Sequence, residues 1–333
     1  MTGELPLAGL RLRRGGHNNE QIFFEHPDHQ GWSIYSSDPA LLNDPGLHSR
    51  PDFVPVLRAV ERARKAPPPT VYLAMAFVTL LLGGVVVFWL VKDHVVNFIA
   101  DKIPISWEQK FGDQTFGEIA AQGKVLTNSP WRPTVQGITE RLLPVVRNSG
   151  YDFRFHILQD TNVNAFAIPG GHVVILTGLL EAADSAEEVA GVLAHELAHV
   201  TRRHSLRNMV KSAGLLVIIQ AAFGDVSGLL AVAAEGSRYL LGQKFSRDFE
   251  READDTGWNY LVEAKIDPRG MIRFFEKMKQ LMTSSGMGAM EGSLALLNTH
   301  PASQERIDRL TAKWEASQSK TDYTPLPPLK RLR

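Results

Sequence analysis

The chain has 333 residues, of which 44% are hydrophobic and 22% are charged, and its formal net charge is zero. This is the profile of a folded protein, and it gives no electrostatic reason to expect nucleic acid as a partner. No cysteine is present, which excludes disulfides, a thiol nucleophile and cysteine-ligated metal. Any metal site must therefore use histidine and carboxylate side chains.

Residues 1–66 are predicted to form a small β-rich domain of their own. The segments LAGLRLR, QIFFEH and GWSIYSS are separated by turn-forming residues and are typical of short strands. A helix is expected over residues 51–65, and three consecutive prolines then break the chain. The histidines here lack the spacing of metal ligands, so a plain small domain is preferred to a second metal site. They are His17, His26, His29 and His48.

An uninterrupted apolar stretch from Thr70 to Val91 is predicted to be a transmembrane anchor over residues 70–92. Its 22 positions carry no charge, and a helix of that length crosses a hydrocarbon core of about 30 Å. A buried core helix is the alternative, but core helices rarely run so long without a polar face. A cleavable signal peptide is not expected, because a whole segment precedes the stretch and no small-residue cleavage site follows it.

Basic residues flank this anchor unequally and predict its orientation. More of them lie on its N-terminal side than just after it, so the N-terminus is expected in the cytoplasm. The remaining chain then lies in the periplasm, and the protein is a single-pass protein of a bacterial inner membrane in contact with membrane lipid. The preceding residues are Arg58, Arg62, Arg64 and Lys65, and the following ones are Lys92 and Lys102.

Residues 100–318 are predicted to form a mostly helical α+β domain. Segments 153–158, 165–168 and 173–176 are its candidate strands. Two apolar runs, 214–223 and 229–234, are too short to cross a bilayer and are expected to be buried helices or a hairpin dipping into the membrane surface. The proline-containing segment 319–333 is expected to be a surface or disordered tail.

The motif His-Glu-Leu-Ala-His, residues 195–199, is the most informative feature of the chain. On a helix, positions i and i+4 share a face, so His195 and His199 can reach one metal ion. Glu196 follows the first histidine, where a metal-bound water needs a general base. The helix is otherwise apolar and begins with a capping box at Ser185 and Glu188, so it is expected to be buried. A zinc ion would supply the partner that its buried polar groups need.

A third zinc ligand is required, because catalytic sites usually have three protein ligands and an open position. Without cysteine it must be His, Glu or Asp, and Glu250 on a second predicted helix is the best candidate. Asp254 lies four residues later on the same face and can accept the free N–H of a ligand histidine. The spacing alone fits a solvated, charged helix face equally well.

Several separate motifs follow one another along residues 105–315: NAFAIPGGHVVILTGLL, EEVAGVLAHELAHVTRRH, SRDFEREADDTG, DPRGMIRFFEKM and THPASQERI. They resemble the HtpX-like and CAAX-prenyl-protease-like zinc metallopeptidases, and in arrangement their single-anchor, periplasmic branches. The resemblance implies a zincin-type domain, one zinc ion per chain and polypeptide substrates. It makes His195, His199 and Glu250 the zinc ligands, Glu196 the general base and Asp254 a supporting residue.

The same resemblance extends to two further elements. Asn164, Ala165 and Phe166 are similar to the family's edge strand along the cleft, where an extended peptide can bind by strand addition. His300 belongs to a family-like His-Pro element and either helps to bind the oxyanion or occupies the metal in a resting form. A structural role at a helix start is the open alternative. His204, five positions beyond the second motif histidine, is off the ligand face and is expected to be structural.

The prediction is therefore a membrane-anchored zinc endopeptidase that cleaves misfolded or membrane-associated proteins in protein quality control. A metal-stabilised chaperone or scaffold is the alternative, although Glu196 disfavours it because a purely structural zinc site needs no base. A latent peptidase, covered by residues 214–234 or by the His300 loop, is a further alternative. A single anchor favours cleavage of periplasmic or membrane-surface segments. The sequence predicts neither an oligomeric state nor the role of residues 1–66.

Overall fold

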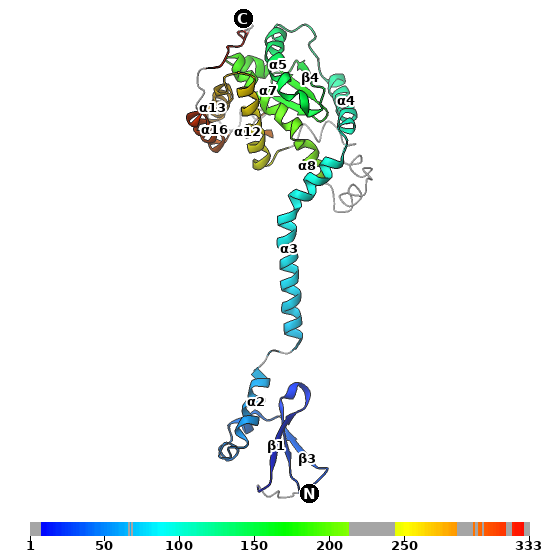
Figure 1. The fold of residues 1–333 in the computed structure, drawn as a ribbon, viewed down its shortest axis with the longest axis vertical. Coiled ribbons are helices and arrows are strands. Elements are labelled where there is room, and N and C mark those ends of the chain that lie inside the picture. The colour runs from blue at the N-terminus through cyan, green and yellow to red at the C-terminus, as the bar shows by residue number, and fades with distance from the viewer. Residues whose placement is uncertain are drawn as a thin grey trace. The chain divides into compact units, whose positions relative to one another are not determined.

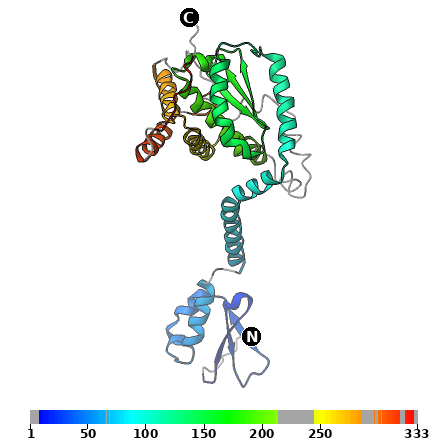
Figure 2. The same ribbon diagram turned by 45° about the horizontal axis from the view of Figure 1, so that its top comes forward.

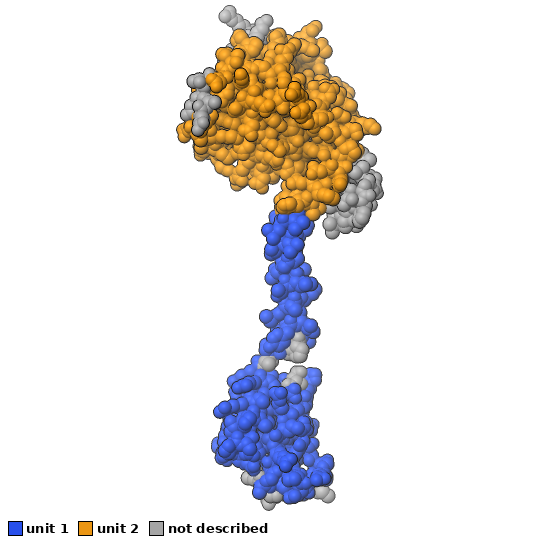
Figure 3. Space-filling model, viewed as in Figure 1, with its two compact units in different colours: residues 1–91 blue, residues 92–333 orange. Residues whose placement is uncertain are grey.

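The computed structural model describes residues 8–65, 67, 69–212, 244–284, 296, 299–301, 303–317 and 322–329. The chain divides into two units, residues 1–91 and residues 92–333, which Figure 3 colours separately. Most of the described residues are helical, and they include two three-stranded sheets. The apolar runs 214–223 and 229–234 lie outside the described residues.

The first unit begins with an antiparallel sheet in the order β1-β2-β3. Its strands are β1 (Arg11–Gly15), β2 (Gln21–Glu25) and β3 (Ser33–Ser36). Short helical segments at His17–Asn19, Pro39–Asn43 and Pro45–His48 and the helix α2 (Val54–Lys65) complete the small domain. A small core joins the sheet to α2, and it is formed by Leu10, Ile22, Phe53, Leu57 and Val60. The strands and the helix agree with those expected from the sequence.

Helix α3 (Pro69–Lys102) contains the apolar stretch and is labelled in Figure 1. Among the described helices, only Thr70–Lys102 is long and apolar enough to cross a membrane, by length and composition. None of its most apolar window is buried by protein. The helix continues beyond the predicted anchor end at residue 92, and one face of its last turns is buried. Val96, Ile99 and Ala100 pack there against α8 (His204–Ser212).

The second unit is built on a mixed sheet in the order β4-β6-β5. Its strands are β4 (Arg154–Leu158), β5 (Ala165–Ile168) and β6 (His172–Leu176), as the sequence predicted. Strand β6 pairs parallel with β4 and antiparallel with β5. The amide of Leu176 donates to the carbonyl of Asn164 at 3.0 Å. Because antiparallel pairs alternate, the backbone groups of Ala165 and Ala167 face away from β6 along the outer edge of β5.

Helices cover both faces of this sheet, as Figure 2 shows. Helix α4 (Ile105–Gln122) covers one face and packs Ile119 against Ile168 and Val174. Helices α5 (Arg132–Val146) and α7 (Ala186–Thr201) cover the opposite face and share the main core with Val173 and Ile175. The alternating side chains of β6 therefore divide between two cores, as a strand with both faces covered requires.

Helix α7 lies at the centre of the second unit, beside α12 (Arg247–Glu263) and α13 (Arg269–Ser284). Figure 1 shows these helices with α16 (Gln304–Ala316); the short α6 (Thr177–Ala182) precedes α7. Two glycines allow the close packing. A Cβ at Gly191 would lie 2.6 Å from the Cα of Met271, and one at Gly257 would lie 3.0 Å from the carbonyl of Ala194. Substituting either glycine would push apart the helices that carry the site.

Residues 322–329, within the segment expected to be a tail, pack on the second unit. The amide of Leu326 donates to Oε1 of Glu187 at 3.0 Å, and the Leu326 side chain is buried. The carbonyl of Thr324 accepts from Nη1 of Arg141 at 2.8 Å, and its amide donates to the carbonyl of Lys265 at 3.0 Å. These residues are therefore part of the packed surface and not a free tail.

Candidate active site

Helix α7 places the three motif residues in the core of the second unit. Its cap forms as expected, because Oγ of Ser185 accepts the amide N–H of Glu188 at 3.3 Å. The Glu188 carboxylate accepts from the amide of residue 184 at 2.9 Å, so the return bond of the capping box goes to the residue before the N-cap. His195, Glu196 and His199 are all buried. Three buried polar side chains on one apolar helix require compensating partners.

The partners come from two other segments. Ligand atoms of His195, His199, Glu250 and His300 all lie within 4.8 Å of one another. The two Nε2 atoms of His195 and His199 are 3.0 Å apart, and Oε2 of Glu250 is 3.5 Å from Nε2 of His195. Nδ1 of His300 lies 2.8 Å from Oε1 of Glu250. Within the described part of the chain, this is the one group of His and acidic residues with the spacing of metal ligands.

These donors fit a zinc ion. Imidazole nitrogen and carboxylate oxygen are the ligands that zinc takes when cysteine is absent. The Nε2 atoms of His195 and His199 also converge on one point inside the protein, and a shared cation compensates for bringing such polar atoms together in a buried site. The site therefore offers what a buried divalent metal needs, and Glu250 is the carboxylate in the group.

The electrostatic environment favours an anionic Glu250. Burial alone would raise the pKa of Glu250, but His300 and His195 outweigh burial and hold it well below its usual range. Burial lowers the pKa of His199 well below its usual value, and the neighbouring His195 lowers it further. A neutral His199 and an ionised Glu250 are the protonation states in which both groups bind metal.

Glu196 has one oxygen engaged and one free. Its Oε2 accepts the amide N–H of Ala167, on the outer edge of β5, at 2.9 Å. Its Oε1 is buried and has no hydrogen-bond partner among the described residues, with Nε2 of His300 3.7 Å away. Burial raises the pKa of Glu196. A carboxylate with a free oxygen and a raised pKa is suited to accept a proton near neutral pH.

Asp254 lies behind the first histidine, where the sequence placed it. Its Oδ1 is 3.1 Å from Nδ1 of His195, and its side chain is 0% exposed. Arg306 from α16 contacts Asp254 through Nε at 2.9 Å and Nη2 at 2.7 Å, and its Nη1 lies 2.8 Å from Oε2 of Glu250. Arg306 is thus a buried part of the site that the sequence did not single out, although it lies within the motif THPASQERI.

His204 was expected to be structural, but the structure places it against a site residue. Its Nδ1 is 2.9 Å from Nδ1 of His199, and its side chain is fully buried. His204 does not join the group of candidate ligands, yet it lies against the ring of His199. Sequence spacing could not show this, because α7 ends at Thr201 and the chain turns before α8 begins at His204.

The predicted edge-strand residues lie at the start of β5. Asn164 precedes the strand and is buried, and Phe166 points toward α4, on the side of the sheet opposite α7. The described contact between this strand and the motif is made by Ala167, one residue beyond the predicted set. The strand therefore meets the site through its backbone.

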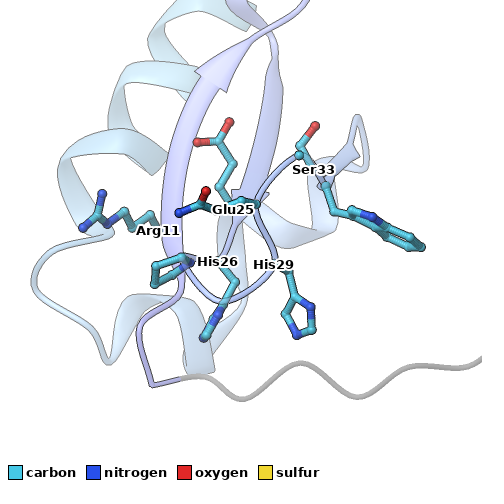
Figure 4. A pocket seen from close by; sticks show the side chains of 9 residues that line it. Arg11, Glu25, His26, His29 and Ser33 are labelled. Carbon is cyan, nitrogen blue, oxygen red and sulfur yellow. The ribbon is translucent and has the colours of Figure 1, made fainter.

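The histidines of the first unit form no comparable group. His26 and His29 line a cavity of about 500 Å³, shown in Figure 4 with Arg11, Glu25 and Ser33. Both ring nitrogens of His26 contact the backbone: Nε2 lies 2.8 Å from the carbonyl of Ala8, and Nδ1 accepts the amide of Asp28 at 3.2 Å. With both nitrogens engaged, His26 is a satisfied core histidine.

Comparison with known proteins identifies the family. The sequence model of peptidase family M48 matches residues 132–313, more than half of the chain. The mitochondrial metalloendopeptidase OMA1 of Schizosaccharomyces pombe is 28% identical over 244 residues, which cover 70% of each chain. A putative beta-barrel assembly-enhancing protease of Vibrio cholerae is 30% identical over 217 residues, covering 62% of this chain and 43% of that protein. Metalloprotease YcaL of Escherichia coli K12 is 31% identical over 170 residues, covering 49% and 62%.

The chain thus spans less than half of the Vibrio cholerae relative's length. The narrower resemblance to the HtpX-like and CAAX-prenyl-protease-like branches stays a prediction. The matched region contains the motif helix, Glu250 and His300, whose ligand atoms the fold brings together. The chain belongs to peptidase family M48 and is a zinc metalloprotease.

Proposed function

We propose that this chain is a membrane-anchored endopeptidase in which His195, His199 and Glu250 bind one zinc ion and Glu196 is the general base. One observation carries the proposal. Buried ligand atoms from three separate segments converge within 4.8 Å of one another, beside a buried carboxylate whose Oε1 has no partner among the described residues. A structural zinc site has no need of such a base.

The chain's own groups divide the work of hydrolysis. A zinc ion held by His195, His199 and Glu250 would polarise the scissile carbonyl and make water more acidic. Glu196 takes a proton from the attacking water on Oε1, because Oε2 is held by the amide of Ala167. It then passes the proton to the leaving amine. Asp254, fixed by Arg306, keeps the ring of His195 turned toward the metal.

The substrate is an extended polypeptide that adds to the outer edge of β5. The backbone groups of Ala165 face away from β6, between Asn164 and Phe166. Ala165 is fully buried, and the carbonyl of Val163 on the same edge accepts from the amide of Leu296 at 3.2 Å, so strand addition would require the segment that carries Leu296 to move away. Bonds to a strand edge depend little on side chains, which suits a peptidase acting on misfolded or membrane-associated proteins. The names of the relatives, a metalloendopeptidase and a β-barrel assembly-enhancing protease, support polypeptide substrates and a role in protein quality control.

The membrane anchor is residues 70–92, between the small domain of residues 1–66 and the peptidase domain of residues 100–318. Apolar side chains cover the first part of α3 on all sides, and in water such a surface would associate or aggregate. The basic cluster from Arg58 to Lys65 supports a cytoplasmic N-terminus. The peptidase domain then lies in the periplasm, at the inner membrane of a bacterium.

The test uses Glu196→Gln, which is isosteric and cannot accept a proton. The full-length protein in detergent is incubated with casein, with and without chelator, and its zinc content is measured. The variant should retain zinc and lose cleavage, whereas wild-type cleavage should disappear with chelator. Full activity of the variant, or loss of its zinc, would contradict the assigned role. If the wild-type protein and its variants bind casein but none of them produces fragments that disappear with chelator, the chaperone alternative would be favoured.

A latent form of the same peptidase is supported by His300. Its Nδ1 lies 3.3 Å from Nε2 of His195 and 2.8 Å from Oε1 of Glu250, among the atoms of the metal group. With His300 as fourth ligand, zinc would have no open position for water or substrate. A trigger that withdraws the segment carrying His300 would then switch the enzyme on.

A further inference from the structure

His199 is backed by a second imidazole and then by a carboxylate. Its Nδ1 lies 2.9 Å from Nδ1 of His204, and Nε2 of His204 lies 3.2 Å from Oε2 of Glu252. We propose that His204 and Glu252 are a positioning pair, which fixes the ring of His199 so that Nε2 points at the metal. The inference rests on the proposed function, because it takes His199 as a zinc ligand.

The distances allow one consistent arrangement of protons. If Nε2 of His199 binds metal, its Nδ1 carries the proton and donates it to Nδ1 of His204. Nδ1 of His204 must then be the acceptor, so the proton of this ring is on Nε2, where it is donated to Glu252. Each ring nitrogen of His204 and the Nδ1 of His199 is then used once, as donor or as acceptor. If the proton of His204 were on Nδ1 instead, its Nε2 and the Glu252 carboxylate would both be acceptors and would face each other.

Packing holds both members of the pair in place. The ring of His204 is fully buried and stacks on Phe249, with centroids 4.5 Å apart and 9° between the planes. Oε2 of Glu252 is also 2.8 Å from Nη1 of Arg207, whose guanidinium lies over the same Phe249 ring. A ring that is stacked and hydrogen-bonded at both nitrogens cannot turn without losing several contacts.

His195, the other motif histidine, is also backed by a carboxylate. His195 is 3.1 Å from Asp254, and His199 reaches Glu252 through one intervening ring. Both carboxylates belong to α12, which also carries Glu250. Such outer partners set the tautomer and basicity of ligand histidines. The helix therefore supplies a ligand and supports for both motif histidines from positions 250, 252 and 254.

The experiment measures zinc affinity of the full-length protein in detergent by competition with a chromogenic chelator. His204→Phe keeps an aromatic ring against Phe249 and removes both hydrogen bonds, so affinity should fall about 10- to 100-fold. His204→Asn keeps an acceptor close to Nδ1 and should lose less. Glu252→Leu should weaken binding, whereas Glu252→Gln, which retains an acceptor, should stay closer to wild type. Glu263→Leu, at an exposed position of the same helix, is the matched control.

Thermal unfolding of the metal-free and zinc-saturated forms separates positioning from simple stabilisation. A positioning role predicts a smaller zinc-induced rise in melting temperature for His204→Phe and recovery with His204→Asn. A merely structural role would lower both melting temperatures equally and leave zinc affinity unchanged, which would overturn the inference. If His204→Phe does not fold, wild-type zinc affinity in Glu252→Leu overturns the inference. A wild-type protein without zinc affinity would overturn the proposed function as well, so the two failures are distinguishable.

Discussion

Nδ1 of His300 lies 2.8 Å from Oε1 of Glu250, and the side chain of His300 is buried. The contact inserts a nitrogen from the segment before α16 into the group formed by α7 and α12. Among the described residues, it brings a fourth donor to a site in which three protein ligands are sufficient for catalysis.

We expect His300→Ala to increase casein cleavage while zinc content stays at one per chain. The change opens the fourth position for water and substrate and leaves His195, His199 and Glu250 in place. Initial rates and metal analysis of the full-length protein measure both effects. Reduced cleavage with zinc retained would show instead that His300 assists the reaction, for example at the oxyanion.

Arg306→Leu should destabilise the peptidase domain strongly. Arg306 is buried at 4% exposure between Asp254 and Glu250, so its loss leaves two buried carboxylates with too little positive charge. Breaking a buried ion pair in this way costs about 3–5 kcal/mol, which corresponds to a melting temperature lower by roughly 6–20 °C for a domain of this size. Thermal unfolding measures the loss.

Arg306→Lys should recover little of that stability, since a lysine cannot reproduce the paired contacts with Asp254. Arg251→Leu provides a control for removing an arginine, because Arg251 is partly exposed and pairs with Glu305 at the surface. Equal melting temperatures for Arg306→Leu and Arg251→Leu would contradict the structural role of Arg306.

Ile99→Ala should destabilise the second unit, although Ile99 belongs to α3, the helix that contains the proposed anchor. Ile99 is 1% exposed and packs with Leu206 and Val210 of α8. Truncating a buried isoleucine costs about 2–5 kcal/mol. Phe98→Ala is the control on the same helix, because Phe98 is 54% exposed and should change stability by less than about 1 kcal/mol. An equal loss of stability in Ile99→Ala and Phe98→Ala would contradict the packing of Ile99 against α8.

The stability of the metal-free protein should decrease as the pH falls from about 6.5 toward 4. Burial, and then the charge of His172, lower the pKa of His156 from 6.5 to about 4. Between these values the unfolded chain binds a proton that the folded protein excludes, so acid favours unfolding. Melting temperatures measured in chelator across this range should fall less steeply for His156→Gln. The exposed His94→Gln should retain the wild-type slope.

Local patterns were sufficient to predict the elements that carry the site. The i, i+4 spacing and the capping residues predicted the buried motif helix, and the absence of cysteine directed attention to Glu250 and Asp254. The structure brings Glu250 within 3.6 Å of His199 and Asp254 within 3.1 Å of His195. Their roles as ligand and support remain predictions until metal is measured.

The contacts that the sequence did not predict join distant segments. Arg306 meets Asp254, and His204 meets Glu252, each across about 50 residues of sequence. The periodicity of apolar residues along a helix or strand does not predict such contacts, because they depend on how α7, α12 and α16 pack together. From the sequence alone, a charged residue on a helix face of mixed polarity is expected to be exposed to solvent. Only the packing of a neighbouring helix shows that it is buried.

The sequence predicted the anchor but not how far its helix extends, for a related reason. Hydropathy ends at Lys92, where charged residues begin, so the predicted anchor stopped there. The helix continues to Lys102 because Val96, Ile99 and Ala100 form an apolar stripe that α8 buries. Only the partner helix, far away in sequence, shows that this stripe belongs to the peptidase domain.

The metal group has a consequence for a chain without cysteine, which cannot form a disulfide. Under the proposed ligand set, zinc joins His199 to Glu250 and closes a loop of about 51 residues. Because the ligands come together only in the folded chain, the free energy of zinc binding would add to the stability of this domain. The ion would then also be a reversible cross-link between α7 and α12, and a protein deprived of zinc would be both less stable and inactive.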